Sequence, residues 1–402
     1  MPRLPENLEV LRDGAFRRLL GAAAVSWFGD RMVAIALAFA VLEIGGSASE
    51  IGLVLAVRTL ALVLSLLFGG VVADRVPRRA VMIGADLSRL VTQGLLAALL
   101  IAGSAEVWSI ALLTGLTGIA TGFFNPASTG LLPAIVPPER LQQANGVRAT
   151  LLSAGEIGGP VIAGVLIAAV GAGWALAVDA GTFAVSGLLL LGVRVPGSVQ
   201  RAASGFFEDL REGWTTFSRT TWVWTFVLWA SLANLTWGAW GVLGPVVAQQ
   251  DLGGAAAWGA INAGLGVGAL LGAIGAIRHT PHRPVVAATL TGFLNVPALA
   301  LLALGAHTVP LALGALAFGV GMMFGNTVWE SALQRHIRPD VLSRVTAYDW
   351  FGSMAFAPIG LAIWGPIAAA AGTSQAIWLA AAITLGSTLV LLCVRDVRRL
   401  TG

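Results

Sequence analysis

The stretch GGVVADRVPRR at residues 69–79 joins two long apolar segments and places one acid and three arginines in a short turn. A glycine such as Gly70 lets two helices approach closely. The carboxylate of Asp74 can accept hydrogen bonds or face the N-terminus of a helix, while the arginines suit the anionic headgroups of a bilayer. We therefore predict a tight hinge between two membrane-spanning helices at this point.

The composition on both sides of this hinge is that of a membrane protein. Hydrophobic residues make up 57% of the 402 residues and charged residues 11%, whereas about 25% of the residues in a soluble domain are charged. About 20 apolar residues cross a bilayer. The apolar stretches predict an all-α polytopic protein with twelve crossings, at about residues 16–44, 51–73, 80–102, 108–131, 141–169, 173–193, 222–248, 256–277, 285–306, 309–332, 342–370 and 374–394.

The basic residues mark one end of these segments. All 24 of them are arginine, and most lie in alternate connections: Arg3, Arg12, Arg17, Arg18, Arg75, Arg78, Arg79, Arg140, Arg194, Arg201, Arg211, Arg219, Arg278, Arg283, Arg335, Arg338, Arg344, Arg395, Arg398 and Arg399. Cytoplasmic loops carry such an excess, so both termini and the central polar stretch are predicted to be cytoplasmic. Membrane orientation, rather than nucleic acid, accounts for the net charge of +4.

The chain also repeats itself at half its length. When the halves are superposed in sequence, Asn125 falls on Asn326 and Leu132 falls on Leu333. This predicts two pseudo-symmetric six-helix bundles, residues 1–195 and 221–402, joined by a cytoplasmic linker at 196–220. Parallel halves of this kind are typical of transporters, with the substrate site between the halves near the midplane.

The residue types that the sequence lacks exclude several kinds of chemistry. Without lysine there is no Walker A phosphate loop and no Schiff base to pyridoxal phosphate or retinal. The single Cys393 excludes intrachain disulfides and thiolate metal clusters, and the four histidines lie between the apolar segments. We expect a protein that is not an enzyme and holds no metal or cofactor.

The turn at 69–79 resembles the loop between helices 2 and 3 of the major facilitator superfamily, which reads Gly-x-x-x-Asp-Arg-x-x-Arg-Arg. Pro77 replaces the usual glycine; the matching residues are Gly70, Asp74, Arg75, Arg78 and Arg79. The resemblance implies the major facilitator fold and a gating role, in which Asp74 bridges to the start of the eleventh helix. A basic turn with one paired acid is the alternative. The equivalent stretch at 278–284 lacks the acid, so the latch is expected on one side only.

The fifth segment carries a second pattern, which resembles a motif of exporters (antiporters) in this superfamily: Gly146, Gly155, Gly159, Pro160 and Gly164. The eighth segment has a matching strip at Gly264, Gly268 and Gly272. The resemblance implies that these two helices face one another across the halves and form a close, sliding seam. Ordinary packing of small residues is the alternative.

Charges inside the apolar segments need a partner or a cavity, because each costs about 2.5–3.5 kcal/mol at the bilayer centre. The first helix lines the cavity in this superfamily, so Asp30 is the leading candidate for proton coupling. Glu156 is the second candidate, and static pairing with Arg31 or Arg58 is the third possibility. The set comprises Asp30, Arg31, Arg58, Arg148, Glu156, Glu330 and Asp349.

Other charged residues have simpler interpretations. Glu330 and Asp349 are expected to pair with arginines at the cytoplasmic gate. Asp86 and Arg89 are spaced i, i+3 and are expected to neutralise each other near the cytoplasmic surface. Asp179 has no evident partner and receives no role.

Polar and aromatic residues deep in the segments are candidates for the substrate cavity. An indole can stack on a flat or cationic ligand, and an asparagine can form hydrogen bonds with it. The candidates are Asn125, Trp229, Trp237, Trp240 and Asn326. Trp222 and Trp224, at the start of the seventh segment, are expected to anchor it at the membrane interface.

The tracts at 122–147, 207–214 and 326–352 resemble the superfamily branch that contains enterobactin exporters and macrolide efflux proteins. This implies a proton antiporter that exports a small amphipathic compound (a drug, siderophore or secondary metabolite) by alternating access and confers multidrug resistance. An uptake symporter of the same fold, or a non-transporting membrane sensor, is the alternative. We expect a monomer in a bacterial inner membrane, with lipid, protons and a small molecule as its partners.

Overall fold

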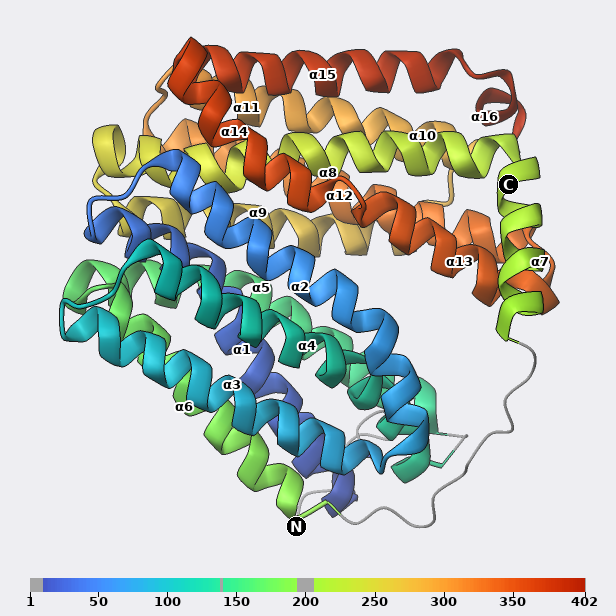
Figure 1. Cartoon of the computed structure of the whole chain (residues 1–402). Helices are drawn as coiled ribbons and strands as arrows, with labels where there is room; N and C mark the ends of the chain where they lie inside the picture. Colours follow the sequence, from blue (N-terminus) through green and yellow to red (C-terminus); the bar gives the residue numbers. More distant parts are fainter. Residues whose placement is uncertain (1–9, 138–139, 194–205, 402) are drawn as a thin grey trace. The chain divides into compact units, whose positions relative to one another are not determined.

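The computed structural model describes residues 10–137, 140–193 and 206–401, which are helical and contain no strand. The first helices are α1 (Gly14–Glu43), α2 (Ala48–Arg75), α3 (Arg78–Ile101), α4 (Val107–Ile135), α5 (Leu141–Val170) and α6 (Ala172–Leu191) (Figure 1). The later ones are α7 (Phe206–Arg219), α8 (Thr221–Val247), α9 (Ala255–Arg278), α10 (Pro284–Leu290), α11 (Asn295–Ala303), α12 (Thr308–His336), α13 (Pro339–Met354), α14 (Ala357–Ala371), α15 (Thr373–Cys393) and α16 (Arg395–Arg399).

Twelve spans among the described residues are long and apolar enough to cross a membrane. This confirms the predicted all-α polytopic fold, and the predicted limits agree closely with the observed ones. The second segment, predicted at about 51–73, is helix Ala48–Arg75, and the last, predicted at about 374–394, is helix Thr373–Cys393. The chain divides into two compact units, residues 1–46 with 53–201, and residues 47–52 with 202–402.

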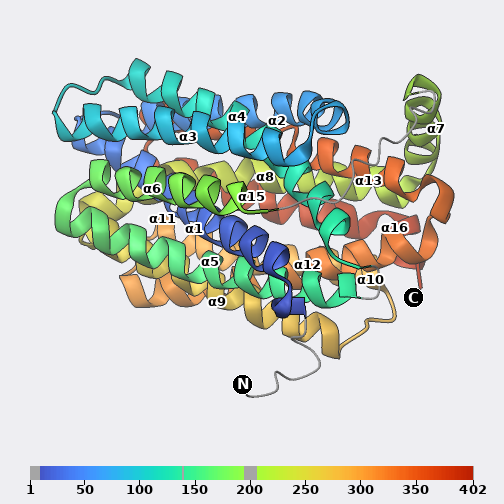
Figure 2. The same cartoon turned by 90° about the horizontal axis from the view of Figure 1, so that it is seen from below.

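In the first unit, α1 packs against α5 and α6, and α3 packs against α4 and α6 (Figure 2). At one end of these helices a core of large apolar side chains is fully buried, among them Phe16, Met82, Phe124 and Leu190. The unit therefore has a conventional apolar core, and the buried charges described below lie within the same helical packing.

In the second unit, α9 packs along α12, and α8 packs against α14 and α15. Two predicted single helices are broken here. The ninth span consists of α10, a 3-10 turn at Thr291–Leu294 and α11, because Pro297 has no N–H and its ring clashes with the carbonyl of Phe293. The eleventh consists of α13 and α14, which begins with Ala357 and Pro358 and so cannot continue the preceding helix.

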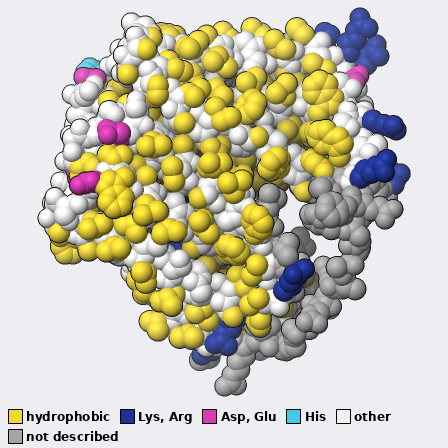
Figure 3. Space-filling model, viewed as in Figure 1, with side chains coloured by type: hydrophobic (Ala, Val, Ile, Leu, Met, Phe, Trp, Pro, Cys, Tyr) yellow, Lys and Arg dark blue, Asp and Glu magenta, His cyan; other side chains and the backbone are white. Residues whose placement is uncertain are grey.

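The described part of the predicted linker contains helix α7, which lies on α13. Trp214 stacks on Phe217 with ring centroids 5.7 Å apart, and Tyr348 of α13 lies 5.4 Å from Trp214 and 5.8 Å from Phe217. In the second unit, arginine side chains gather at the end that holds α7 and α16, while hydrophobic side chains cover the helix faces (Figure 3). This matches the segregation of basic residues expected of a membrane protein.

Candidate functional site

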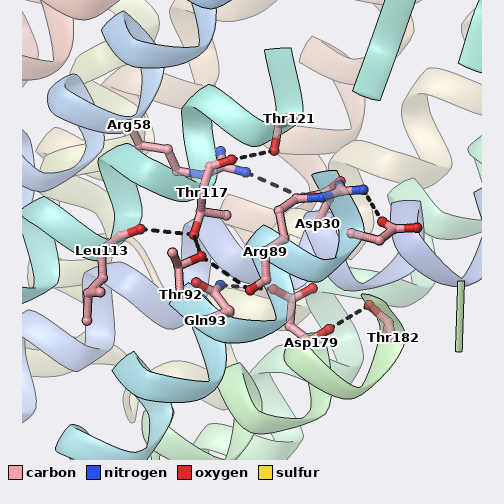
Figure 4. Close-up of polar contacts among 11 residues, drawn as sticks. Asp30, Arg58, Arg89, Thr92, Gln93, Leu113, Thr117, Thr121, Asp179 and Thr182 are labelled. Carbon is pink, nitrogen blue, oxygen red and sulfur yellow. Dashed lines mark hydrogen bonds and ion pairs between the residues drawn. The ribbon is translucent and has the colours of Figure 1, made fainter. Parts of the chain in front are cut away.

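Charged side chains meet inside the first unit, between α1, α2 and α3 (Figure 4). Oδ1 of Asp30 lies 3.6 Å from Nη2 of Arg58, and Oδ2 of Asp30 lies 3.5 Å from Nη1 of Arg89. Arg89 also donates a hydrogen bond to Asp86, one turn earlier on α3. These four residues, which we call the charge cluster, alternate in sign. The side chains of Asp86 and Arg89 are buried, whereas those of Asp30 and Arg58 are each 18% exposed.

Two aromatic rings enclose the guanidinium group of Arg89. Its Cζ lies 4.2 Å from the ring centroid of Phe124 on α4 and 4.2 Å from that of Phe183 on α6. A guanidinium is attracted to the face of an aromatic ring, so the rings replace water above and below the cation. Its hydrogen-bond donors lie at the edge of the plane, which remains available to carboxylates.

Hydrogen bonds extend this arrangement to α4 and α6. Ser186 donates to Oδ2 of Asp86 at 2.7 Å, and Nε2 of Gln93 donates to Oδ2 of Asp179 at 2.9 Å. On the other side of α3, the hydroxyls of Thr92 and Thr117 lie 2.8 Å apart. Polar side chains of α3 therefore bind to both neighbouring helices, although all three helices are predominantly apolar.

Two glycines bring the surrounding helices close enough for these contacts. A Cβ on Gly29 of α1 would overlap Oδ1 of Asp179, and a Cβ on Gly118 of α4 would lie 2.5 Å from the carbonyl oxygen of Arg58. Real Cβ atoms essentially never approach so closely. Any larger residue would therefore displace α1 from α6, or α2 from α4.

The structure gives the surroundings of one predicted pair and reveals a residue that the sequence analysis missed. Asp86 and Arg89 pair as expected, and both side chains are buried, because Asp30 and the two aromatic rings replace water around Arg89. Asp179, which received no role, is fully buried beside them. The sequence feature that could have pointed to Asp179 is the polar series Asp86, Arg89 and Gln93 on α3, spaced i, i+3, i+7. A polar face of this kind inside a membrane needs polar partners on a neighbouring helix.

The other predicted intramembrane charges lie outside the charge cluster. Nη2 of Arg31 is 2.9 Å from Oε1 of Glu156, and both side chains are partly exposed. Arg148 lies with its Cζ 4.8 Å from the ring centroid of Trp27. Of the two arginines considered for Asp30, the structure places Arg58 beside it, whereas Arg31 contacts Glu156. Whether Asp30 couples protons or forms a static pair remains a prediction.

In the second unit, the predicted acids have polar neighbours on α12. Both Oδ atoms of Asp349 lie 3.2 Å from Nε1 of Trp329, which donates to them. Glu330 accepts a hydrogen bond of 3.3 Å from Nδ2 of Asn326. A gating role for these acids remains a prediction.

The aromatic candidates for the cavity are largely packed against their own unit. Nε1 of Trp229 donates to Thr388 at 3.1 Å, and Trp240 is 2% exposed and donates to Asn262 at 3.3 Å. Trp237 stacks on Trp240 with centroids 5.9 Å apart. These indoles contribute to packing in this structure, whereas the side chains of Asn125 and Asn326 are exposed.

One predicted interface anchor is also buried. Trp222 is 8% exposed and packs edge-on against Trp329, with centroids 5.4 Å apart. Trp224 is 39% exposed. Of the two indoles at the start of α8, only the second therefore lies at the surface.

Most glycines of the two strips face a helix of their own unit, and the expected seam between the fifth and eighth segments remains a prediction. A Cβ on Gly159 of α5 would lie 2.5 Å from Cβ of Arg31 on α1, and Gly155 faces Phe28 on the same helix. Gly264, Gly268 and Gly272 of α9 face the backbone of α12. Gly146 meets nothing within 4 Å. The glycine-lined faces at Gly155 and Gly159 of α5, and along α9, are therefore occupied by α1 and α12, which belong to the same units.

The hinge at 69–79 forms the end of α2 and the start of α3. The side chain of Asp74 and the surroundings of Gly70 lie outside the described residues. Arg78 donates to the carbonyl oxygen of Gly130, and Arg79 donates to those of Leu190 at 2.9 Å and Leu191 at 2.5 Å. These arginines satisfy backbone groups, in the case of Arg79 at the C-terminal end of α6.

Comparisons with known proteins agree with this architecture. Residues 19–353 match the Major Facilitator Superfamily. The multidrug efflux pump Tap of Mycolicibacterium fortuitum is 27% identical over 379 residues, covering 89% of this chain and 90% of the relative. Macrolide efflux protein A of Streptococcus pyogenes is 23% identical over 398 residues, covering 96% and 97%.

Solved structures show the same fold at low sequence identity. The nucleoside transporter NupG has a TM-score of 0.75 at 14% identity, covering 96% of this chain and 99% of that one. A bacterial homologue of the human lysosomal transporter Spinster, solved in an inward-facing and unoccupied conformation, has a TM-score of 0.75 at 13% identity, covering 96% of each chain. Together with the family match across most of its length, this shows that the chain is a multi-pass membrane transporter and belongs to the major facilitator superfamily.

Proposed function

We propose that this transporter exports a small amphipathic compound, such as a drug, a siderophore or a secondary metabolite, in exchange for protons. The direction is supported by the relatives named as efflux proteins, which match along nearly the whole chain. In this proposal a single polypeptide in a bacterial inner membrane, with both termini in the cytoplasm, alternates between inward-open and outward-open states.

The observation that carries proton coupling is the charge cluster around Asp30. This carboxylate is partly exposed and contacts two arginines on different helices, Arg58 and Arg89. Protonation would remove its charge and weaken both contacts together, so that a proton changes how α1 is held to α2 and α3. One proton moving down a gradient of one pH unit and 100 mV supplies about 1.4 plus about 2.3 kcal/mol, enough for uphill export of a neutral compound.

The hinge supplies the gate in this proposal. Gly70, Asp74 and Arg75 would form a cytoplasmic latch, while Arg78 holds the hinge to α4 and Arg79 holds it to the end of α6. We expect Asp74→Asn to abolish transport in proteoliposomes while leaving substrate affinity within about twofold. Equal loss of binding and transport would contradict the latch role.

A resistance screen tests the function as a whole. The chain, expressed in a pump-deficient bacterium, is expected to raise the inhibitory concentration of at least one amphipathic toxic compound several-fold, and a protonophore should abolish the gain. Asp251→Asn, a change of an exposed acid, serves as the matched control and should retain the resistance. In everted vesicles, acidifying the lumen should drive the same compound inward; accumulation under the opposite gradient would identify a symporter, and binding without flux a sensor.

A further inference from the structure

Asp179 on α6 is a fully buried carboxyl group with one hydrogen-bond donor (Figure 4). Nε2 of Gln93 donates to its Oδ2 at 2.9 Å, and among the described residues Oδ1 has no partner. Oε1 of Gln93, itself 1% exposed, is also a buried oxygen without a donor. Two buried acceptor oxygens thus have nothing to donate to them, an arrangement that is costly for a charged carboxylate.

The balance of charges around Asp179 also disfavours a charged carboxylate at this position. Within the described part of the bundle interior, Asp30, Asp86 and Asp179 face the two cations Arg58 and Arg89. Each of the other two acids contacts a guanidinium, whereas Asp179 accepts a hydrogen bond only from an amide. If all five groups were ionised, one buried negative charge would remain unbalanced.

The remaining helix packed against α6 supplies no further cation. On α5, Glu156 is paired with Arg31 of α1, and Arg148 lies over an indole ring of α1. At the far end of α1, the carboxylate of Glu43 accepts a hydrogen bond from the first N–H of α6 at 2.9 Å. Glu156, Arg31, Arg148 and Glu43 thus have other partners among the described residues. A bound proton can supply the positive charge that is missing near Asp179.

We propose that Asp179 is a second proton-binding site of the transporter, in addition to Asp30, and that it carries a proton in the state described here. The proton sits on one carboxyl oxygen of Asp179. Oδ1 of Asp179 and Oγ1 of Thr182 lie against the same side of Gly29, and Oε1 of Gln93 is a second buried oxygen without a donor. On release, the O–H bond breaks, the proton passes to water and Asp179 becomes a carboxylate.

Arg89 then responds to the new charge. Its guanidinium lies between two aromatic rings and its Nε has no partner among the described residues, so it can turn within its plane toward Asp179 and away from Asp30. Loss of one proton would thus change the link between α1 and α3. The claim that this proton is exchanged for substrate rests on the proposed antiport. The claim that Asp179 holds a proton does not rest on it.

Infrared difference spectroscopy on the protein in lipid tests the occupancy directly. The wild type at pH 7 should show the C=O stretching band of a protonated carboxyl group, Asp179→Asn should remove it, and Asp251→Asn should keep it. Gln93→Met, which removes the donor to Asp179, should move the band to higher frequency and provides a second measurement if Asp179→Asn does not fold. A band unchanged in both Asp179→Asn and Gln93→Met would overturn the proposal, as would a band that appears only when sodium is withdrawn, which would indicate a bound sodium ion.

Transport assays separate this inference from the proposed function. In proteoliposomes Asp179→Asn should retain substrate exchange within about twofold of the wild type but lose the response to a pH gradient. If it keeps the full pH response, the inference is wrong and proton antiport still stands. If the wild type shows the band but no proton-driven flux, the proton site stands and the antiport does not.

Discussion

At the scale of single residues, Arg89 is the centre of the charge cluster. It is buried, contacts acids on two helices and lies between two aromatic rings. A buried ion pair adds little net stability compared with apolar residues, but removing one partner leaves a charge that nothing compensates. Arg89 therefore matters chiefly because Asp86 and Asp30 are already buried beside it.

We expect Arg89→Met to lower the free energy of unfolding by about 3–5 kcal/mol, because Asp86 then loses its cation. Thermal unfolding in detergent measures this as a lower midpoint. The double variant Arg89→Met with Asp86→Asn should recover much of the loss, since both members of the pair are then neutral. A double variant no more stable than Arg89→Met would contradict this account.

Asp30→Asn tests the coupling role of the exposed end of the cluster. The amide cannot carry a proton or balance Arg58, so accumulation against a gradient should fall to the background while exchange of substrate across proteoliposomes continues. Asp251→Asn should behave as the wild type in the same assay. Unchanged pH-dependent accumulation in Asp30→Asn would remove this residue from the coupling mechanism.

At the scale of helices, glycine strips decide which pairs approach most closely. Along α9, Gly264, Gly268 and Gly272 face the carbonyl oxygens of successive turns of α12, so this pair packs backbone to backbone. In membranes, where burial of apolar surface gives no driving force between helices, such close packing is a main source of stability. The strips therefore help to hold the helices of each unit together.

We expect Gly268→Ala to destabilise the protein by about 1–3 kcal/mol, because its Cβ would overlap the carbonyl oxygen of Leu316. Gly386→Ala on α15 is the matched control: nothing lies within 4 Å of its Cβ, and alanine should stabilise the helix by about 0.5–1 kcal/mol. The midpoints of thermal unfolding should move in opposite directions. Equal shifts would show that helix propensity, not the contact with α12, governs Gly268.

At the scale of the whole molecule, the distribution of arginine predicts the orientation in the membrane. The single Cys393 is exposed at the end of the last span, next to Arg395, Arg398 and Arg399. It is predicted to lie on the cytoplasmic side. The exposed residue Ser104, in the connection between α3 and α4, is predicted to lie on the opposite side.

A membrane-impermeant maleimide tests this topology in cells. Cys393 should react only after the cells are opened, whereas Ser104→Cys, made in a Cys393→Ser background, should react in intact cells. The Cys393→Ser protein without a new cysteine gives the background of the assay. Labelling of Cys393 in intact cells together with protection of Ser104→Cys would invert the predicted orientation.

The sequence alone was sufficient for the properties that depend on single segments. Apolar runs long enough to cross a bilayer predicted the twelve spans, and the turn at 69–79 pointed to the superfamily, because both signals are local in the chain. Breaks at Pro297 and Pro358 escaped prediction, although the residues are visible, because a proline inside an apolar run does not by itself say whether neighbours will satisfy the freed backbone groups.

Only the tertiary structure decided which charges meet. Asp30 and Arg31 are adjacent in sequence, yet they face different partners, Arg89 with Arg58 in one case and Glu156 in the other. Asp179 lies far along the chain from Gln93, and no spacing links them. Successive residues on a helix point about 100° apart, so the rotation and packing of each helix determine the partners, and these are settled by long-range contacts that no local pattern encodes.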